Sequence, residues 1–181
     1  MTLSSKAISF MLFAGLALFG AMGSSQAQGG MDGDVNETLA RLFRHVPGTQ
    51  GLAARAAGVL VFPTVVKAGI GIGGEYGEGE LRVGGRTAGY YNTASASIGF
   101  QLGAEARSVV IMFMTPHSFN EFRRMDGFKV GVDGSIAIIT VGAGGSVDTE
   151  NITSPVIGFI IDPKGLMYNL TLEGSKISRM R

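Results

Sequence analysis

The sequence predicts an α+β protein with a curved, barrel-like, mostly antiparallel β-sheet, helices at its N-terminal end and one short helix in the middle. Helical spacing of apolar residues is confined to the start of the chain and one later segment. Most of the remainder alternates between apolar and polar residues, as strands with one solvent-facing side do. Much of the abundant glycine lies on single faces of these strands, where it marks bends or the close approach of a second layer.

The first 27 residues have the layout of a signal peptide. Lys6 supplies a positive start, an almost wholly apolar run extends from Ala7 to Met22, and the small residues Ser25 and Ala27 precede the expected cut. The run is shorter than the roughly 20 residues of a spanning helix, so cleavage is favoured over the alternative of a retained anchor. Residues 28–34 are expected to form a flexible tail, and residues 35–181 a single domain.

The composition excludes several classes of protein. The chain has no cysteine, which rules out thiol catalysis, thiolate metal sites and a lipid-modified N-terminal cysteine. Without Lys6, 14 basic residues face 14 acidic ones, so the mature chain lacks the basic surplus typical of nucleic-acid binders. We therefore expect a periplasmic or secreted protein that is not a lipoprotein and binds no nucleic acid.

Three helices are expected. The first runs from Asp34, a plausible N-cap with Glu37 three residues on, to Pro47–Gly48, because one apolar stripe recurs at helical spacing: Val35, Leu39, Leu42, Phe43 and Val46. Such a stripe more often packs on the protein's own core than on a membrane. A second short helix covers residues 50–57. Thr115 as cap and Pro116 in the first turn predict the middle helix, which ends near Arg124.

Strand signals begin after Gly58. A short strand, Val59–Phe62, is expected to stop at Pro63, and strict alternation predicts one long strand over Thr93–Glu105. The apolar run Val109–Met114 indicates a strand buried on both faces. Further strands are expected over 128–132, 136–141, 156–161 and 166–172, the last two joined as a hairpin by the turn at residues 162–165.

No catalytic residue, metal site or cofactor is predicted, and we do not expect an enzyme. Residues 69–74 match the nucleotide-binding pattern G-x-G-x-x-G, but Glu75, Glu78 and Glu80 follow where a helix should begin and phosphates would lie. A glycine-lined strand explains the match better, and an acidic hairpin rim explains the three glutamates better than a cation site. The histidines, His45 and His117, have neither metal-ligand nor catalytic spacing.

Basic residues beside apolar ones are the remaining candidates. Such groups can attract an anionic lipid surface, each contributing on the order of 1 kcal/mol. The candidate lipid-binding residues are Lys67, Arg82, Arg86, Arg123 and Arg124, and further basic residues are Lys129, Lys176, Arg179 and Arg181. The alternative is that these are ordinary solvated charges, balanced by acidic neighbours such as Glu121 and Asp126.

Four glycine-anchored blocks, taken in order, resemble the SYLF domain, a lipid-binding domain also described as an actin-binding domain in yeast. They lie within Ala57–Pro63, Lys67–Gly79, Ser97–Ala104 and Lys164–Gly174, and the likeness covers about residues 35–181. The resemblance implies binding to membrane lipids and, for bacterial members, an exported or envelope role. It makes Lys67, which lies in a matched block, the first ligand-contact candidate. The missing cysteine departs from the lipoprotein pattern of many bacterial relatives, and actin is not expected as the partner of an exported bacterial copy.

The expected function is thus non-enzymatic binding to a phospholipid or membrane surface in the cell envelope. The alternative is a structural or assembly protein that acts through protein–protein contacts, including contacts between copies of itself. The sequence names neither the lipid nor the oligomeric state.

Overall fold

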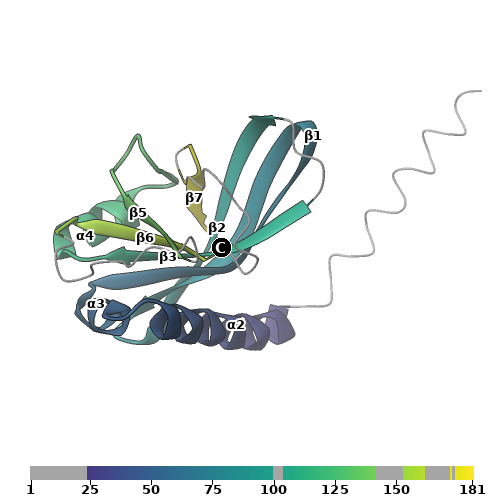
Figure 1. Cartoon of the computed structure of the whole chain (residues 1–181). Coiled ribbons are helices and arrows are strands. Elements are labelled where there is room, and N and C mark those ends of the chain that lie inside the picture. The colour runs from purple at the N-terminus through teal and green to yellow at the C-terminus, as the bar shows by residue number, and fades with distance from the viewer. Residues whose placement is uncertain (1–23, 100–103, 142–152, 162–171, 173) are drawn as a thin grey trace, which may run out of the picture. The chain divides into compact units, whose positions relative to one another are not determined.

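The computed structural model describes residues 24–99, 104–141, 153–161, 172 and 174–181. Contacts divide the chain into residues 1–30 and 31–181, and the second unit is the folded domain considered below. Its helices are α2 (Ser24–His45, which begins in the first unit), α3 (Thr49–Arg55) and α4 (Pro116–Arg124). The described strands are β1 (Gly58–Val83), β2 (Arg86–Gly99), β3 (Ala104–Phe113), β4 (Phe128–Lys129), β5 (Ala137–Val141), β6 (Val156–Ile161) and β7 (Lys176–Arg179) (Figure 1).

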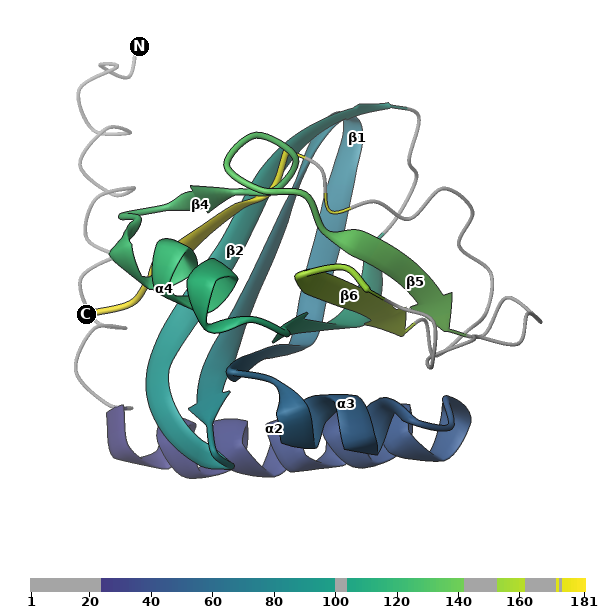
Figure 2. The same ribbon diagram turned by 90° about the vertical axis from the view of Figure 1, so that its left-hand side faces the viewer.

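These strands form one curled sheet in the order β4-β7-β2-β1-β3-β6-β5. All neighbouring strands are antiparallel except β5 and β6, which are parallel. The sheet curves around α4, while α2 and α3 lie on its other face (Figures 1 and 2). The predicted α+β class, with a barrel-like, mostly antiparallel sheet, N-terminal helices and a short middle helix, is confirmed.

The curvature is concentrated in β1, a strand of 26 residues at the centre of the sheet. Its first part pairs with β3 and its second part with β2. A Cβ on Gly77 would lie 2.8 Å from the carbonyl oxygen of Thr64, and a Cβ on Gly79 would collide with the carbonyl oxygen of Val61. The late part of β1 therefore lies against its early part, and only glycine allows this approach.

Each face of the sheet is packed against helices. Leu60 and Phe62 belong to the core on the α4 side, whereas Val59 and Val61 belong to the core shared with α2 and α3. The same alternation along β3 confirms the strand predicted to be buried on both faces. In α4 the ring of Phe122 stacks 4.6 Å from that of Phe113, so α4 fills the concave side of the sheet.

The first helix is longer than expected. Residues 28–34 lie within α2, so Asp34 is an interior position rather than the N-cap. Gly33 costs about 1 kcal/mol in a helix relative to alanine, which is why local propensity favoured a later start. The early turns gain a tertiary contact instead, because Asp32 forms an ion pair with Arg82 at 2.6 Å. The second and middle helices are confirmed, with Thr115 Oγ1 accepting a hydrogen bond from the backbone N–H of Ser118 at the α4 N-cap.

Three strand boundaries differ from expectation. Pro63 does not end a strand but lies within β1, where the register with β3 shifts between Phe62 and Val65; a bulge tolerates the missing N–H. The segment 93–105 is not one strand, since its first part ends β2 and its last residues begin β3, on opposite sides of β1. The strand expected over 128–132 ends at Lys129, because Gly131 turns the chain with φ 84°.

One strand was missed and one hairpin is untested. β7 has four residues with a single buried apolar side chain, Ile177, which is too short a pattern to predict a strand. It nevertheless joins β2 to β4. The strand predicted over residues 166–172, and so its hairpin with β6, lies mostly outside the described residues.

Candidate functional site

Figure 2 shows α4 beside β4 at one edge of the sheet. The end of α4, β4 and its neighbour β7 carry exposed basic residues. Lys129 and Lys176 are direct partners in the antiparallel ladder between β4 and β7. The side chain of Lys176 passes beside Gly127, where a Cβ would lie 3.1 Å from its Nζ. Arg123 and Arg124 form the last turn of α4. We call these four residues, Arg123, Arg124, Lys129 and Lys176, the basic edge.

The pairing of the two lysines of the basic edge destabilises this part of the sheet, because like charges directly opposite each other repel. Asp133, four residues after Lys129, is used within the following turn, where Asp133 Oδ2 accepts from the Lys129 backbone N–H at 2.6 Å. An anion in front of this pair would remove the repulsion. The ordinary structural role also applies to the arginines, since cations are favourable in the last turn of a helix and Arg123 lies 5.6 Å from the centroid of the Phe119 ring.

Exposed apolar side chains lie near the basic edge in the sequence. Met125, directly after α4, is 38% exposed, and Val132, in the turn after β4, is 75% exposed. The backbone of that turn is held by a hydrogen bond from Gly131 N to Gly134 O at 3.0 Å. Cations next to exposed apolar groups suit the boundary between lipid headgroups and acyl chains.

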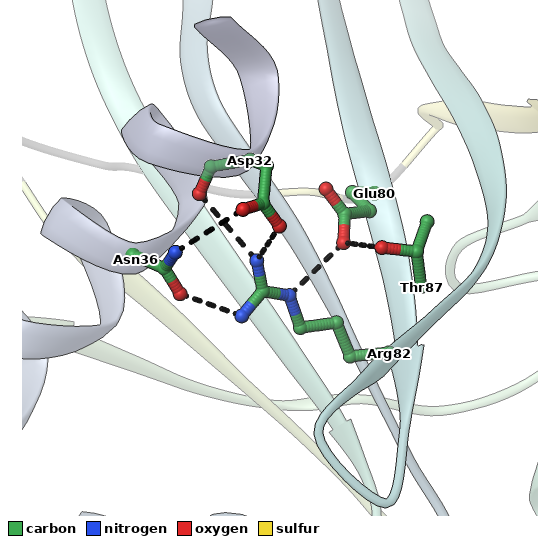
Figure 3. Close-up of polar contacts among 5 residues, drawn as sticks. All are labelled: Asp32, Asn36, Glu80, Arg82 and Thr87. Carbon is green, nitrogen blue, oxygen red and sulfur yellow. Dashed lines mark hydrogen bonds and ion pairs between the residues drawn. The ribbon is translucent and has the colours of Figure 1, made fainter. Parts of the chain in front are cut away.

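Arg82, in contrast, is engaged inside the protein (Figure 3). Its Nε donates to Glu80 Oε1 at 3.0 Å, and its terminal nitrogens donate to Asp32 Oδ1 and Asn36 Oδ1, each at 2.6 Å. Glu80 is fully buried, and its Oε1 also accepts from Thr87 Oγ1 at 2.7 Å. Because β1 contributes the buried pair and α2 the outer partners, this network ties the helix to the sheet.

Lys67 also forms an ion pair. Its Nζ lies 3.7 Å from Glu75 Oε1, and Arg107 Nη2 donates to Glu75 Oε2 at 2.6 Å. Glu75 and Arg107 border a cavity of about 10 Å³ among core side chains, which is room for about one water. The Lys67 side chain is 23% exposed, so it reaches solvent less than the arginines of the basic edge.

The remaining candidate, Arg86, is exposed at the start of β2, just after the turn at Gly84 and Gly85. The structure thus packs α4, which ends with Arg123 and Arg124, against β4 through the rings of Phe122 and Phe128 at 5.6 Å. It places Lys67 and Arg82 in separate ion-pair networks. Sequence reasoning did not find the pairing of Lys129 with Lys176. The alternation in Lys176–Arg179 was a usable signal, although a weak one.

One side chain on β1, Tyr76, has a perturbed pKa. The Tyr76 hydroxyl donates to Glu78 Oε1 at 2.8 Å. This hydrogen bond, followed by partial burial and the nearby negative charge, raises the pKa of Tyr76 above its usual 10.0. Both side chains are exposed, and neither is part of a converging group of titratable residues.

The alternative sites considered from the sequence have a structural explanation. The glycine pattern at residues 69–74 lies inside β1, with strand rather than helix after it, so it lacks the helix N-terminus that a pyrophosphate needs. Within the described part of the chain, no three His, Asp or Glu side chains gather as metal ligands would. Nor does any described helix have the length and hydropathy needed to cross a bilayer.

Fold and surface together define a β-rich α+β domain that presents a basic, partly apolar edge. Residues 94–181 match the model of the family described as "Las17-binding protein actin regulator", Ysc84. This is the SYLF family, so the match over residues 94–181 confirms the resemblance carried by the glycine blocks. The blocks at 57–63 and 67–79 precede the matched range. A comparison with curated proteins finds no match.

Proposed function

We propose that this chain is a non-enzymatic lipid-binding protein of the cell envelope, and that it contacts anionic membrane surfaces through the basic edge. The match of residues 94–181 to a family of binding domains, with lipid or actin-related partners, supports a binding role. The signal-peptide layout supports export. The observation that carries the lipid contact is the cross-strand pair Lys129 and Lys176, with exposed Met125 and Val132 nearby in the sequence.

The basic edge suits a diffuse anionic surface better than a single small ligand. Its four cations are all exposed. Attraction of this kind acts over about a Debye length and weakens as salt rises. The exposed apolar side chains would then add affinity that salt does not screen.

The test is sedimentation of the purified full chain with vesicles of phosphatidylcholine alone or mixed with phosphatidylglycerol. We expect binding to the mixed vesicles that falls as salt increases. Lys176→Glu should weaken it about 30-fold, because each basic group near an anionic leaflet contributes on the order of 1 kcal/mol and the substitution also adds a repelled charge. The variant creates an opposite-charge pair with Lys129, so the fold should not suffer.

Arg41→Glu is the matched control. It makes the same change in net charge on α2, where Arg41 pairs with Glu37 at 3.6 Å. We expect it to bind within about threefold of the wild type. Equal losses for both variants would reduce the effect to net charge and refute the basic edge as the contact. Concentration-dependent oligomers without vesicle binding would instead favour a structural or assembly role.

A further inference from the structure

A second feature lies away from the basic edge. An apolar cleft of about 290 Å³ opens between the N-terminal helices and the turn that joins β1 to β2. Its wall is mainly carbon, with side chains from both helices and the first residues of β1: Leu39, Phe43, Ala53, Ala54, Ala56 and Val59. This volume is at the lower end of small-ligand sites.

The mouth of the cleft is open because the turn carries no side chains. Gly84 and Gly85 line it, with φ 57° and 78°, and a Cβ at either position would meet nothing within 4 Å. Leu39, Phe43, Ala53 and Ala56 are only partly buried although they pack against the core. The cleft is therefore accessible apolar surface rather than a sealed packing defect.

Charged residues next to the lining residues in the sequence indicate how an amphiphilic ligand would be oriented in the cleft. Arg44, Arg55 and Arg86 are all exposed, and each adjoins a lining residue in the sequence. Arg82 also lines the cleft, but its guanidinium is committed to the carboxylates of Glu80 and Asp32. These two carboxylates disfavour a further anion beside Arg82. An anionic group is favoured at the outer rim.

We propose that this cleft binds one aliphatic chain of an anionic amphiphile, with the chain inside and the headgroup beside the rim arginines. The site is separate from the basic edge, and it extends the proposed function by naming a single acyl chain as ligand. A membrane phospholipid and a free fatty acid share this chemistry. The volume accommodates one chain, since two-chain burial would need a site well above 290 Å³.

The test uses a series of n-alkyl phosphates from hexyl to dodecyl, below their micelle concentrations, titrated calorimetrically into the full chain. Each methylene that enters an apolar site should strengthen binding about fourfold, and the increase should stop when the chain outgrows the cleft. Alkyl glucosides of equal length should bind about tenfold more weakly, because they lack the charge that the arginines would meet. Affinity independent of chain length would overturn the proposal.

Ala53→Phe should abolish the chain-length dependence by filling the cleft. Glu37→Phe adds the same ring on α2 at an exposed residue that neither lines the cleft nor belongs to the rim arginines, and it should keep the chain-length dependence. Because the phenylalanine at position 53 could disturb packing, both variants are compared by thermal unfolding. A second variant, Leu39→Ala, enlarges the cleft and should move the plateau to longer chains. Unchanged dependence in folded Ala53→Phe and an unmoved plateau in Leu39→Ala would each refute the cleft.

Two further arms separate the sources of the chain and the two sites. Protein incubated with vesicles containing phosphatidic acid, and then freed of them by centrifugation, retains lipid if the cleft takes a chain from a membrane. If the protein instead retains added oleate but no phosphatidic acid, the source of the chain is a free fatty acid. Lys176→Glu should leave alkyl phosphate binding unchanged. Vesicle binding without alkyl phosphate binding would therefore overturn the cleft and leave the proposed function standing.

Discussion

The buried carboxylate of Glu80 gives a quantitative test of how α2 is held to the sheet. Glu80 is 0% exposed, and its Oε2 has no hydrogen-bond partner among the described residues. Its charge is therefore balanced mainly by Arg82, at 3.0 Å, and by the hydroxyl of Thr87. Replacing Arg82 by methionine keeps most of the aliphatic stem but leaves the carboxylate buried beside one hydroxyl.

Removing one member of a buried ion pair costs about 3–5 kcal/mol, since the remaining charge is uncompensated. Because the Arg82 side chain is 12% exposed, water can reach part of the site, and we expect Arg82→Met to cost about 3 kcal/mol. The outer partner behaves differently. Asp32 has a side chain that is 55% exposed, so Asp32→Ala should cost about 1 kcal/mol or less.

The measurement is urea unfolding of the purified chain, followed by circular dichroism because the sequence has no tryptophan. The double variant Glu80→Met/Arg82→Met is the decisive comparison. Removing both charges should restore stability to within about 1 kcal/mol of the wild type. A loss below about 1 kcal/mol for Arg82→Met alone, or a double variant as unstable as that single one, would refute the view that Glu80 needs its partner.

Two further predictions concern β1 and α2. Gly79→Ala should destabilise the fold by about 1–3 kcal/mol, because its Cβ would collide with the carbonyl of Val61. Gly33→Ala should stabilise the fold by up to about 1 kcal/mol, since a Cβ there has open space within α2. Equal effects of the two substitutions in thermal unfolding would contradict the close approach in β1. Glu78→Gln should lower the pKa of Tyr76 toward its usual value, because Glu78 raises it through a hydrogen bond and its charge. The raised pKa of Tyr76 contributes stability that is fully present below the tyrosine pKa of the unfolded chain and is lost as pH rises through the pKa in the folded protein. If ultraviolet titration finds the same Tyr76 pKa in Glu78→Gln, Glu78 is excluded as the cause of the shift.

Local patterns determined much of the fold. The stripe from Val35 to Val46 and the cap at Thr115 depend only on neighbouring residues, so periodicity and capping rules were sufficient to find these two helices, although not the start of α2. The uninterrupted apolar run of β3 likewise indicated burial on both faces. The glycine blocks identified the SYLF family, which the match over residues 94–181 confirms.

Only the tertiary structure decided which charges are available to a partner. Arg82 and Asp32 are 50 residues apart, and their contact both extends α2 and takes Arg82 out of the exposed surface. Lys129 and Lys176 meet because β7 inserts between β2 and β4. Sequence spacing carries no information on such pairs, because whether a basic side chain faces solvent or a buried carboxylate depends on which distant strand or helix the fold places beside it.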